Sequence, residues 1–175
     1  MIPRGTRILV TGADHPPALA VVRGLGRAGA HVIVAAEHQT SAQYSRFAAE
    51  RVTYRSPTRM SAAFIDDVMA AVERTRPHLV LPADAETMFA LVAARPLMEA
   101  FVPVAAAPTP ALDCMRDACA AIALARQLRI PAPAWAAGDG ASELVAAARA
   151  LHPPLELRVR HDGGFLRAES RIEHQ

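Results

Sequence analysis

The stretch at residues 7–37, RILVTGADHPPALAVVRGLGRAGAHVIVAAE, decides the fold. A short apolar run at residues 8–10 leads into Thr11-Gly12, and a second apolar run at residues 32–34 is followed by Glu37. An amphipathic segment that ends at Gly29 separates the two runs. Two parallel strands connected by a helix have this order of elements. The stretch therefore predicts a strand–helix–strand unit of a parallel α/β sheet.

The turn after the first apolar run differs from a dinucleotide-binding loop. Such a loop needs three glycines at fixed places, so that the backbone can approach a pyrophosphate. Here the turn reads Asp14-His15-Pro16-Pro17. Proline has no N–H for a phosphate, and the carboxylate of Asp14 would repel one. The prolines suit the first turn of a helix instead, so an NAD(P)-dependent oxidoreductase is the least favoured function.

Strands continue to alternate with helices up to about residue 110. Apolar runs predict strands at residues 51–54, 78–82 and 101–104, and helical periodicity predicts helices at 61–75 and 85–95. Phe64, Val68 and Val72 would face the core, and Ser61 would cap its helix. This order is typical of a doubly wound, Rossmann-like parallel sheet. We therefore assign residues 1–110 to one α/β domain.

Ligands of such sheets bind at the carboxyl ends of the strands. The polar residues expected at those ends are Asp14, His15, Glu37, Asp84, Glu86 and Thr109. We select Asp14, His15, Asp84 and Glu86 as candidate substrate-binding residues. The alternatives stay open: Asp14 or His15 caps the helix that follows, and so does one of Asp84 and Glu86. For Glu37 a solvated carboxylate is favoured over a ribose ligand.

The pattern changes after residue 110. Residues 111–128 are strongly helical, residues 130–133 are extended, and residues 141–151 predict another helix. Residues 155–160 and 165–169 predict a β-hairpin around a turn that contains Gly163 and Gly164. Residues 111–175 thus form a small, incomplete α+β segment. It is either an appendage of the first domain or the opening part of a domain that this chain does not complete.

Composition excludes several function classes. The 175 residues carry a net charge of +2 without a basic stripe, so nucleic acid is not an expected partner. No apolar run approaches the roughly 20 residues of a membrane helix, and a leader peptide has no room, so we expect a cytoplasmic protein without membrane contact. Cys114 and Cys119 are expected as free thiols, and the scattered histidines predict no metal site. No catalytic residue is assigned, and a homodimer stays open.

Three phrases of the second segment resemble the ATP-grasp superfamily, closest to its carboxylate–amine ligases and carbamoyl-phosphate-synthase-like members. Asp117 opens a helix, LRIPAP follows at residues 128–133, and PLELR follows at 154–158. Weaker matches are SRF at residues 45–47, Ser56-Pro57 before a helix, and LVLP at 79–82 before Asp84 and Glu86. The resemblance implies a pre-ATP-grasp domain at residues 1–110 and a partial ATP-grasp subdomain at 111–175. It also implies ATP and Mg²⁺ as cofactors, and a small carboxylate or amine as substrate.

The chain departs from the family at the residues that hold ATP phosphates. The first family lysine corresponds to Ala118 and the second to Arg158, which keeps the charge but not the shape. The resemblance assigns phosphate contacts to Arg158, Gly163 and Gly164. The alternatives are that Arg158 is an exposed arginine of a strand and that the two glycines form an ordinary hairpin turn. The magnesium ligands would lie beyond Gln175, so we expect this chain alone to be inactive. It would be the N-terminal fragment, or a truncated relative, of a ligase that activates a carboxylate as an acyl phosphate and joins it to an amine or thiol. The alternative is a non-catalytic domain that binds a small ligand or a partner chain.

Overall fold

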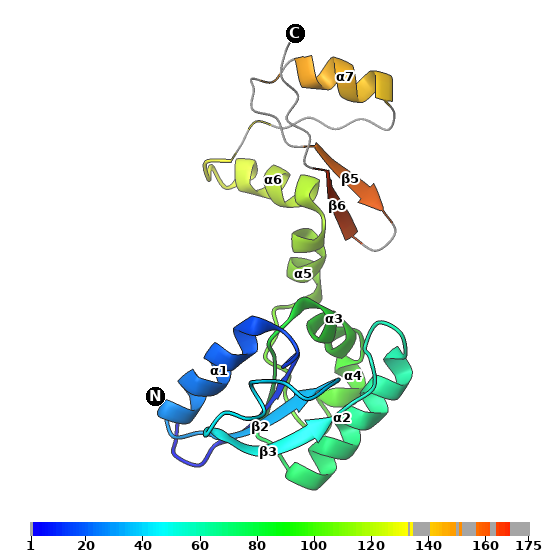
Figure 1. The fold of residues 1–175 in the computed structure, drawn as a ribbon. Helices are drawn as coiled ribbons and strands as arrows, with labels where there is room; N and C mark the ends of the chain where they lie inside the picture. The colour runs from blue at the N-terminus through cyan, green and yellow to red at the C-terminus, as the bar shows by residue number, and fades with distance from the viewer. Residues whose placement is uncertain are drawn as a thin grey trace. The chain divides into compact units, whose positions relative to one another are not determined.

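The computed structural model describes residues 2–132, 134, 141–149, 151, 157–161 and 164–168. The chain divides into two compact units, Met1–Ala107 and Pro108–Gln175. Figure 1 shows the helices and strands of both units in chain order. Within the described residues, no helix combines the length and the hydropathy needed to cross a bilayer.

The first unit is built on a four-stranded parallel sheet. Its strands are β1 (Arg7–Thr11), β2 (His31–Ala36), β3 (Ala48–Thr53) and β4 (Leu79–Pro82), in the spatial order β3-β2-β1-β4. Leu9 pairs with Ile33 on one side and with Val80 on the other. The predicted parallel, Rossmann-like α/β fold is therefore confirmed.

Helices cover both faces of this sheet. Helix α1 (Pro16–Arg27) packs on one face, and α2 (Ser61–Thr75), α3 (Ala85–Ala93) and α4 (Arg95–Met98) contribute to the core on the other. Because side chains alternate along a strand, β1 divides its residues between the two cores. Ile8 and Val10 pack with Val22 of α1, and Leu9 packs with Phe64 and Leu91. The sheet is thus doubly wound, as predicted.

The strand predicted at residues 101–104 is wrong. This segment makes one isolated parallel bridge, between Val104 and Val80 of β4. The Val80 amide donates to the Pro103 carbonyl at 3.0 Å, and the Ala105 amide donates to Val80 at 2.8 Å. Proline has no N–H and cannot extend a ladder. The apolar pattern reflects burial of Val102 and Val104 in the core rather than a strand.

Helix boundaries also differ from the prediction in places. The expected helix at residues 85–95 ends at Ala93, and the short α4 follows. Ser61 is the first residue of α2 rather than its cap, and the capping residue, Met60, has no side-chain hydrogen bond to the helix. Phe64, Val68 and Val72 are buried, as the helical spacing predicted.

The second unit begins with two consecutive helices, α5 (Thr109–Arg116) and α6 (Ala118–Gln127). The helical run predicted at residues 111–128 is interrupted at Asp117. Its extended backbone leaves the helix, and its carboxylate accepts from the amides of Cys119 at 2.9 Å and Ala120 at 3.2 Å. Aspartate competes for backbone amides in this way and is therefore a good N-cap. Asp117 opens a helix, as predicted.

The remaining described elements are helix α7 (Ala141–Arg149) and the strands β5 (Leu157–His161) and β6 (Gly164–Ala168). The two strands form an antiparallel pair in which Arg158 lies opposite Arg167. The predicted hairpin is confirmed for these strands. Cys114 and Cys119 are free thiols.

Candidate functional site

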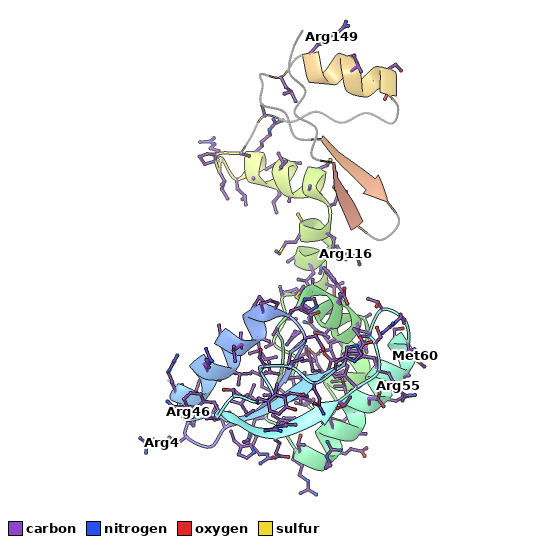
Figure 2. All side chains as sticks on the ribbon, in the orientation of Figure 1. Arg4, Arg46, Arg55, Met60, Arg116 and Arg149 are labelled. Atoms are coloured by element: carbon purple, nitrogen blue, oxygen red, sulfur yellow. The ribbon has the colours of Figure 1, made fainter. Side chains whose placement is uncertain are left out.

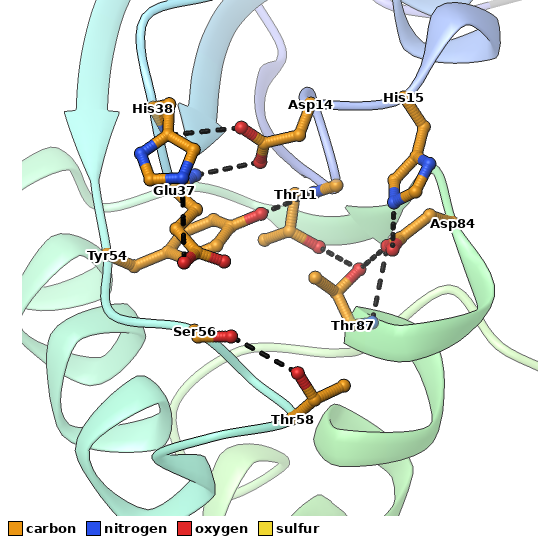
Figure 3. A network of polar contacts seen from close by, with 11 residues as sticks. Thr11, Asp14, His15, Glu37, His38, Tyr54, Ser56, Thr58, Asp84 and Thr87 are labelled. Carbon is orange, nitrogen blue, oxygen red and sulfur yellow. Dashed lines mark hydrogen bonds and ion pairs between the residues drawn. The ribbon is translucent and has the colours of Figure 1, made fainter. Parts of the chain in front are cut away.

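The carboxyl ends of the four strands meet at one edge of the sheet. The chain passes from β1 outward to β2 and β3 and then returns to the other side of β1 as β4. Strand order therefore reverses between β1 and β4, and ligands of open α/β sheets bind at such a switch point. Asp14 and His15 follow β1, and Asp84 follows β4. Figure 3 shows these residues at the ends of their strands.

Asp84 is held firmly at the switch point. It caps α3, where its carboxylate accepts from the Thr87 amide at 3.2 Å and from the Thr87 hydroxyl. The Thr11 hydroxyl of β1 donates to the Thr87 oxygen at 3.1 Å, which connects the two strand ends through buried groups. The capping alternative for Asp84 is confirmed. Its second oxygen lies 3.3 Å from Nε2 of His15, and its side chain is 8% exposed.

Asp14 does not cap α1, so that alternative is wrong. The capping position belongs to His15, whose side chain makes no capping bond. The two carboxylate oxygens of Asp14 accept instead from the amides of Glu37 at 2.8 Å and His38 at 3.0 Å. These amides follow β2, so Asp14 connects the ends of β1 and β2. Local sequence rules describe caps within a few residues and gave no signal for this contact.

Three candidate residues come together at the switch point. One ligand atom each of His15, Asp84 and Glu86 lie within 4.8 Å of one another, and the side chains of His15 and Glu86 are accessible to solvent. Glu86 stands in the first turn of α3. Two carboxylates beside an imidazole give a group of hydrogen-bond acceptors with negative charge. Such a group suits a cationic ligand, either an ammonium group or a divalent metal ion.

The structure also contains a pocket that sequence reasoning missed. It has a volume of about 570 Å³ and lies at the carboxyl ends of β2 and β3. It is lined by Glu37, Thr53, Tyr54, Arg55, Ser56, Arg59, Met60 and Asp67. The sequence offered Glu37 as a ribose ligand and Ser56-Pro57 only as a weak family match, and neither indicated a pocket. A further signal was the density of arginines and hydroxyls in the stretch RSPTRM at residues 55–60.

Two ion pairs line this pocket. Glu37 pairs with Arg59, whose side chain is 72% exposed, whereas the carboxylate is largely shielded. Arg55 binds Asp67 through its Nε at 2.9 Å and one Nη at 2.8 Å, and its backbone amide donates to the same carboxylate at 2.8 Å. The Arg55 pair is fixed by three bonds, and the Arg59 pair is a single exposed contact. Figure 2 shows Arg55 and Met60 on the first unit.

The same contacts predict how the Asp67 carboxyl group titrates. Hydrogen bonds from the Arg55 side chain hold the pKa of Asp67 below its ordinary value of 3.8. The lowered folded-state pKa gives stability that is present above the unfolded-state pKa and lost as the pH falls through the folded-state value. We expect R55Q to raise the Asp67 pKa, measured by NMR of the carboxyl carbon, and R74Q on the exposed end of α2 to leave it unchanged. An unchanged value in R55Q would contradict the assignment.

Tyr54 forms part of the pocket wall and connects it to β1. The Gly12 amide donates to its phenol oxygen at 2.9 Å, and its ring meets Phe64 edge to face at 5.0 Å. Burial raises the pKa of Tyr54 well above its ordinary value, and the carboxylates of Asp14, Asp84 and Glu37 add to the rise. The phenol therefore keeps its proton and remains a donor at neutral pH.

The implied phosphate-binding residues lie in the second unit. Ala118 is the first residue of α6, and the Asp117 carboxylate occupies the amides at that helix end. A methyl group beside a carboxylate does not fit a phosphate, so this described part of the implied ATP site departs from the family. Arg158 lies in β5 and Gly164 is the first residue of β6. Gly163 lies outside the described residues. Thr109 is the first residue of α5 and not a strand-end residue.

Several solved structures share this fold. An L-amino acid ligase from Bacillus licheniformis is 14% identical, with a TM-score of 0.62 over 97% of this chain and 40% of its own. A biotin carboxylase from Campylobacter jejuni is 17% identical, with a TM-score of 0.60 over 85% of this chain and 34% of its own. The biotin carboxylase domain of 2-oxoglutarate carboxylase from Hydrogenobacter thermophilus is 13% identical, with a TM-score of 0.60 over 89% of this chain and 35% of its own. No protein-family model and no curated protein matches the chain.

These likenesses show the fold of the chain. The chain shares its fold with a part of each of these enzymes, and the parallel α/β fold is the one that the sequence predicted. The chain spans a little over a third of the length of these neighbours.

Proposed function

We propose that this chain is the N-terminal part, or a truncated relative, of an ATP-grasp-type ligase, and that the β1/β4 edge binds the amine group of a small-molecule substrate. The observation that carries this proposal is the convergence of His15, Asp84 and Glu86 at the switch point of this fold. The sequence left a carboxylate and an amine as alternative substrates. Carboxylate groups at this edge repel a second carboxylate and attract an ammonium group.

Each residue has a distinct role in this proposal. Asp84 is oriented by Thr87 and presents its second oxygen to the ligand, so little conformational entropy is lost on binding. Glu86 contributes an accessible second charge, and His15 an imidazole that accepts or donates with its protonation state. Asp14 acts as a positioning residue, because both of its oxygens are used by the amides after β2.

The ligase reaction belongs to the first part of this proposal, which relates the chain to an ATP-grasp-type ligase. A ligase of this type activates a carboxylate as an acyl phosphate and passes the acyl group to an amine or thiol. The neighbour from Hydrogenobacter was crystallised as a dimer with MgADP and bicarbonate, which supports nucleotide use and a homodimer for proteins of this fold. In this chain Ala118 supplies no cation for a phosphate. We therefore assign substrate binding, not phosphoryl transfer, to the described residues.

Amine binding is tested by NMR titration of the full chain with n-butylamine and butyrate, which each contain four carbons and carry opposite charges. We expect n-butylamine to shift the amides of Asp14–His15 and Asp84–Glu86, and butyrate to leave them unchanged. E86Q should weaken amine binding about fivefold, since one partly exposed charge contributes up to about 1 kcal/mol. E73Q, an exposed carboxylate of α2, is the matched control. Equal shifts with butyrate would contradict the proposal.

The non-catalytic alternative has its own support in Ala118 and in the capping of α6 by Asp117. Calorimetry with ATP, with and without Mg²⁺, separates the two readings. Tight, magnesium-dependent binding by this chain would exclude the non-catalytic domain. Amine binding without any nucleotide response would favour it.

A further inference from the structure

The pocket at the ends of β2 and β3 contains a buried phenol whose proton has no acceptor among the described residues. The Tyr54 phenol is 4% exposed and accepts from Gly12, and among the described residues nothing accepts its own proton. Ser56 is 7% exposed, and its hydroxyl shares one hydrogen bond of 3.2 Å with the Thr58 hydroxyl. If Thr58 donates in this bond, the Ser56 proton is free for a ligand, and if Ser56 donates, the free proton is on the exposed Thr58. Buried hydroxyl groups are normally satisfied, so the pocket is equipped for a ligand with acceptor atoms.

The charges of the pocket lining identify the kind of ligand. Two arginines, Arg55 and Arg59, and two acids, Glu37 and Asp67, give a lining with zero net charge. A free anion such as phosphate would bring negative charge against Glu37 without compensation. A ligand that carries one positive and one negative group matches both members of an ion pair and leaves the balance unchanged.

One of the two ion pairs can open at low cost. Arg55 and Asp67 are joined by several bonds, but Arg59 reaches Glu37 through a single guanidinium nitrogen from a largely exposed position. Fully exposed ion pairs contribute about 0–1 kcal/mol, and only the Arg59 side of this pair is exposed. Nε2 of His38 lies 3.6 Å from the same Glu37 oxygen and stays beside it when Arg59 leaves. A zwitterion that inserts between Arg59 and Glu37 replaces this pair by two new ones, so the number of satisfied charges rises.

We propose that this pocket binds a free amino acid as its zwitterion, with the carboxylate on Arg59 and the Tyr54 phenol and the ammonium group on Glu37. The side chain of the amino acid would lie toward Met60, which is half exposed at the pocket. A volume of about 570 Å³ falls within the range of small-molecule sites. This inference goes beyond the proposed function, because it depends on neither ATP nor the His15–Asp84–Glu86 cluster.

The test uses the full chain and four probes: L-leucine, 4-methylpentanoate, which lacks the amine, 3-methylbutylamine, which lacks the carboxylate, and inorganic phosphate. Binding is followed by the amide shifts of residues 53–60 in NMR titrations. We expect L-leucine to bind at least about tenfold more tightly than each of the other probes, because either half alone leaves one charge of the opened pair unmatched. Shifts confined to the β1/β4 edge are scored separately and report on the proposed amine site.

Substitutions test the proposed roles of Arg59 and Glu37. R59Q and E37Q should each weaken L-leucine binding about tenfold, whereas R74Q and E73Q, matched changes at the exposed end of α2, should alter it less than about twofold. Circular dichroism verifies that all four variants are folded. The proposal is overturned if phosphate or 4-methylpentanoate binds as tightly as L-leucine, if neither R59Q nor E37Q weakens binding, or if L-leucine at about 10 mM shifts none of these amides.

Discussion

Replacing Gly12 by alanine is expected to lower the free energy of unfolding by about 3 kcal/mol. Gly12 has a φ of +74°, in the left-handed region, and a Cβ built at this position overlaps the carboxylate of Asp84. Alanine costs about 1 kcal/mol in this backbone conformation. Asp84 must also move and give up part of its cap on α3, which costs about another 1 kcal/mol. The remainder is the strain of fitting a methyl group among buried atoms.

Urea denaturation followed by circular dichroism measures this loss. Gly24 is the matched control, because it lies in α1, has no positive φ, and an added Cβ there meets nothing within 4 Å. G24A should be neutral or stabilising by up to about 1 kcal/mol, as expected when alanine replaces glycine in a helix. Equal stability of G12A and the unmodified chain would show that Asp84 is not packed against Gly12.

The second large effect is expected for F64A, which should destabilise the chain by about 4 kcal/mol. Phe64 of α2 is fully buried in the core against the sheet, and its ring meets that of Tyr54 edge to face. Its removal leaves a cavity and loses an aromatic contact of about 1 kcal/mol. Because Tyr54 forms a wall of the pocket, we also expect the amide shifts of residues 53–60 to change in this variant.

Phe101 provides the control for F64A. It is 62% exposed, so F101A removes the same side chain without leaving a cavity, and its effect should stay within about 0.5 kcal/mol. Urea denaturation of both variants gives the comparison. If F101A lowered the free energy of unfolding as much as F64A, burial of the phenylalanine would not determine the destabilisation.

Much of the first unit could be predicted from the sequence, because its strands and helices have strong periodic patterns. The apolar runs of β1, β2 and β4 are nearly continuous, as expected for strands buried on both faces. The prediction failed where an apolar pattern could arise either from a strand or from a buried segment without regular structure. Residues 101–104 are apolar because Val102 and Val104 are buried, but Pro103 prevents a regular ladder.

The candidate site was predictable in its position and not in its contacts. The rule for parallel sheets placed Asp14, His15, Asp84 and Glu86 at one edge, and the local capping rule anticipated the role of Asp84. Whether these four side chains bind a substrate remains a prediction. The bonds of Asp14 to the Glu37 and His38 amides span more than 20 residues, and the pocket depends on side chains brought together only by the fold. No short motif encodes either feature.

The two hydrogen bonds that Asp14 accepts from the amides after β2 have a consequence for ligand binding. One of these amides belongs to Glu37, whose side chain lines the pocket, while Asp14 itself follows β1 beside His15. A ligand that displaces the backbone at Glu37 must break the bonds that orient Asp14, and a ligand that draws Asp14 away must release Glu37. A ligand that acts in either way would link the two regions energetically. Thermodynamic linkage then requires that each ligand changes the affinity for the second ligand by the same factor.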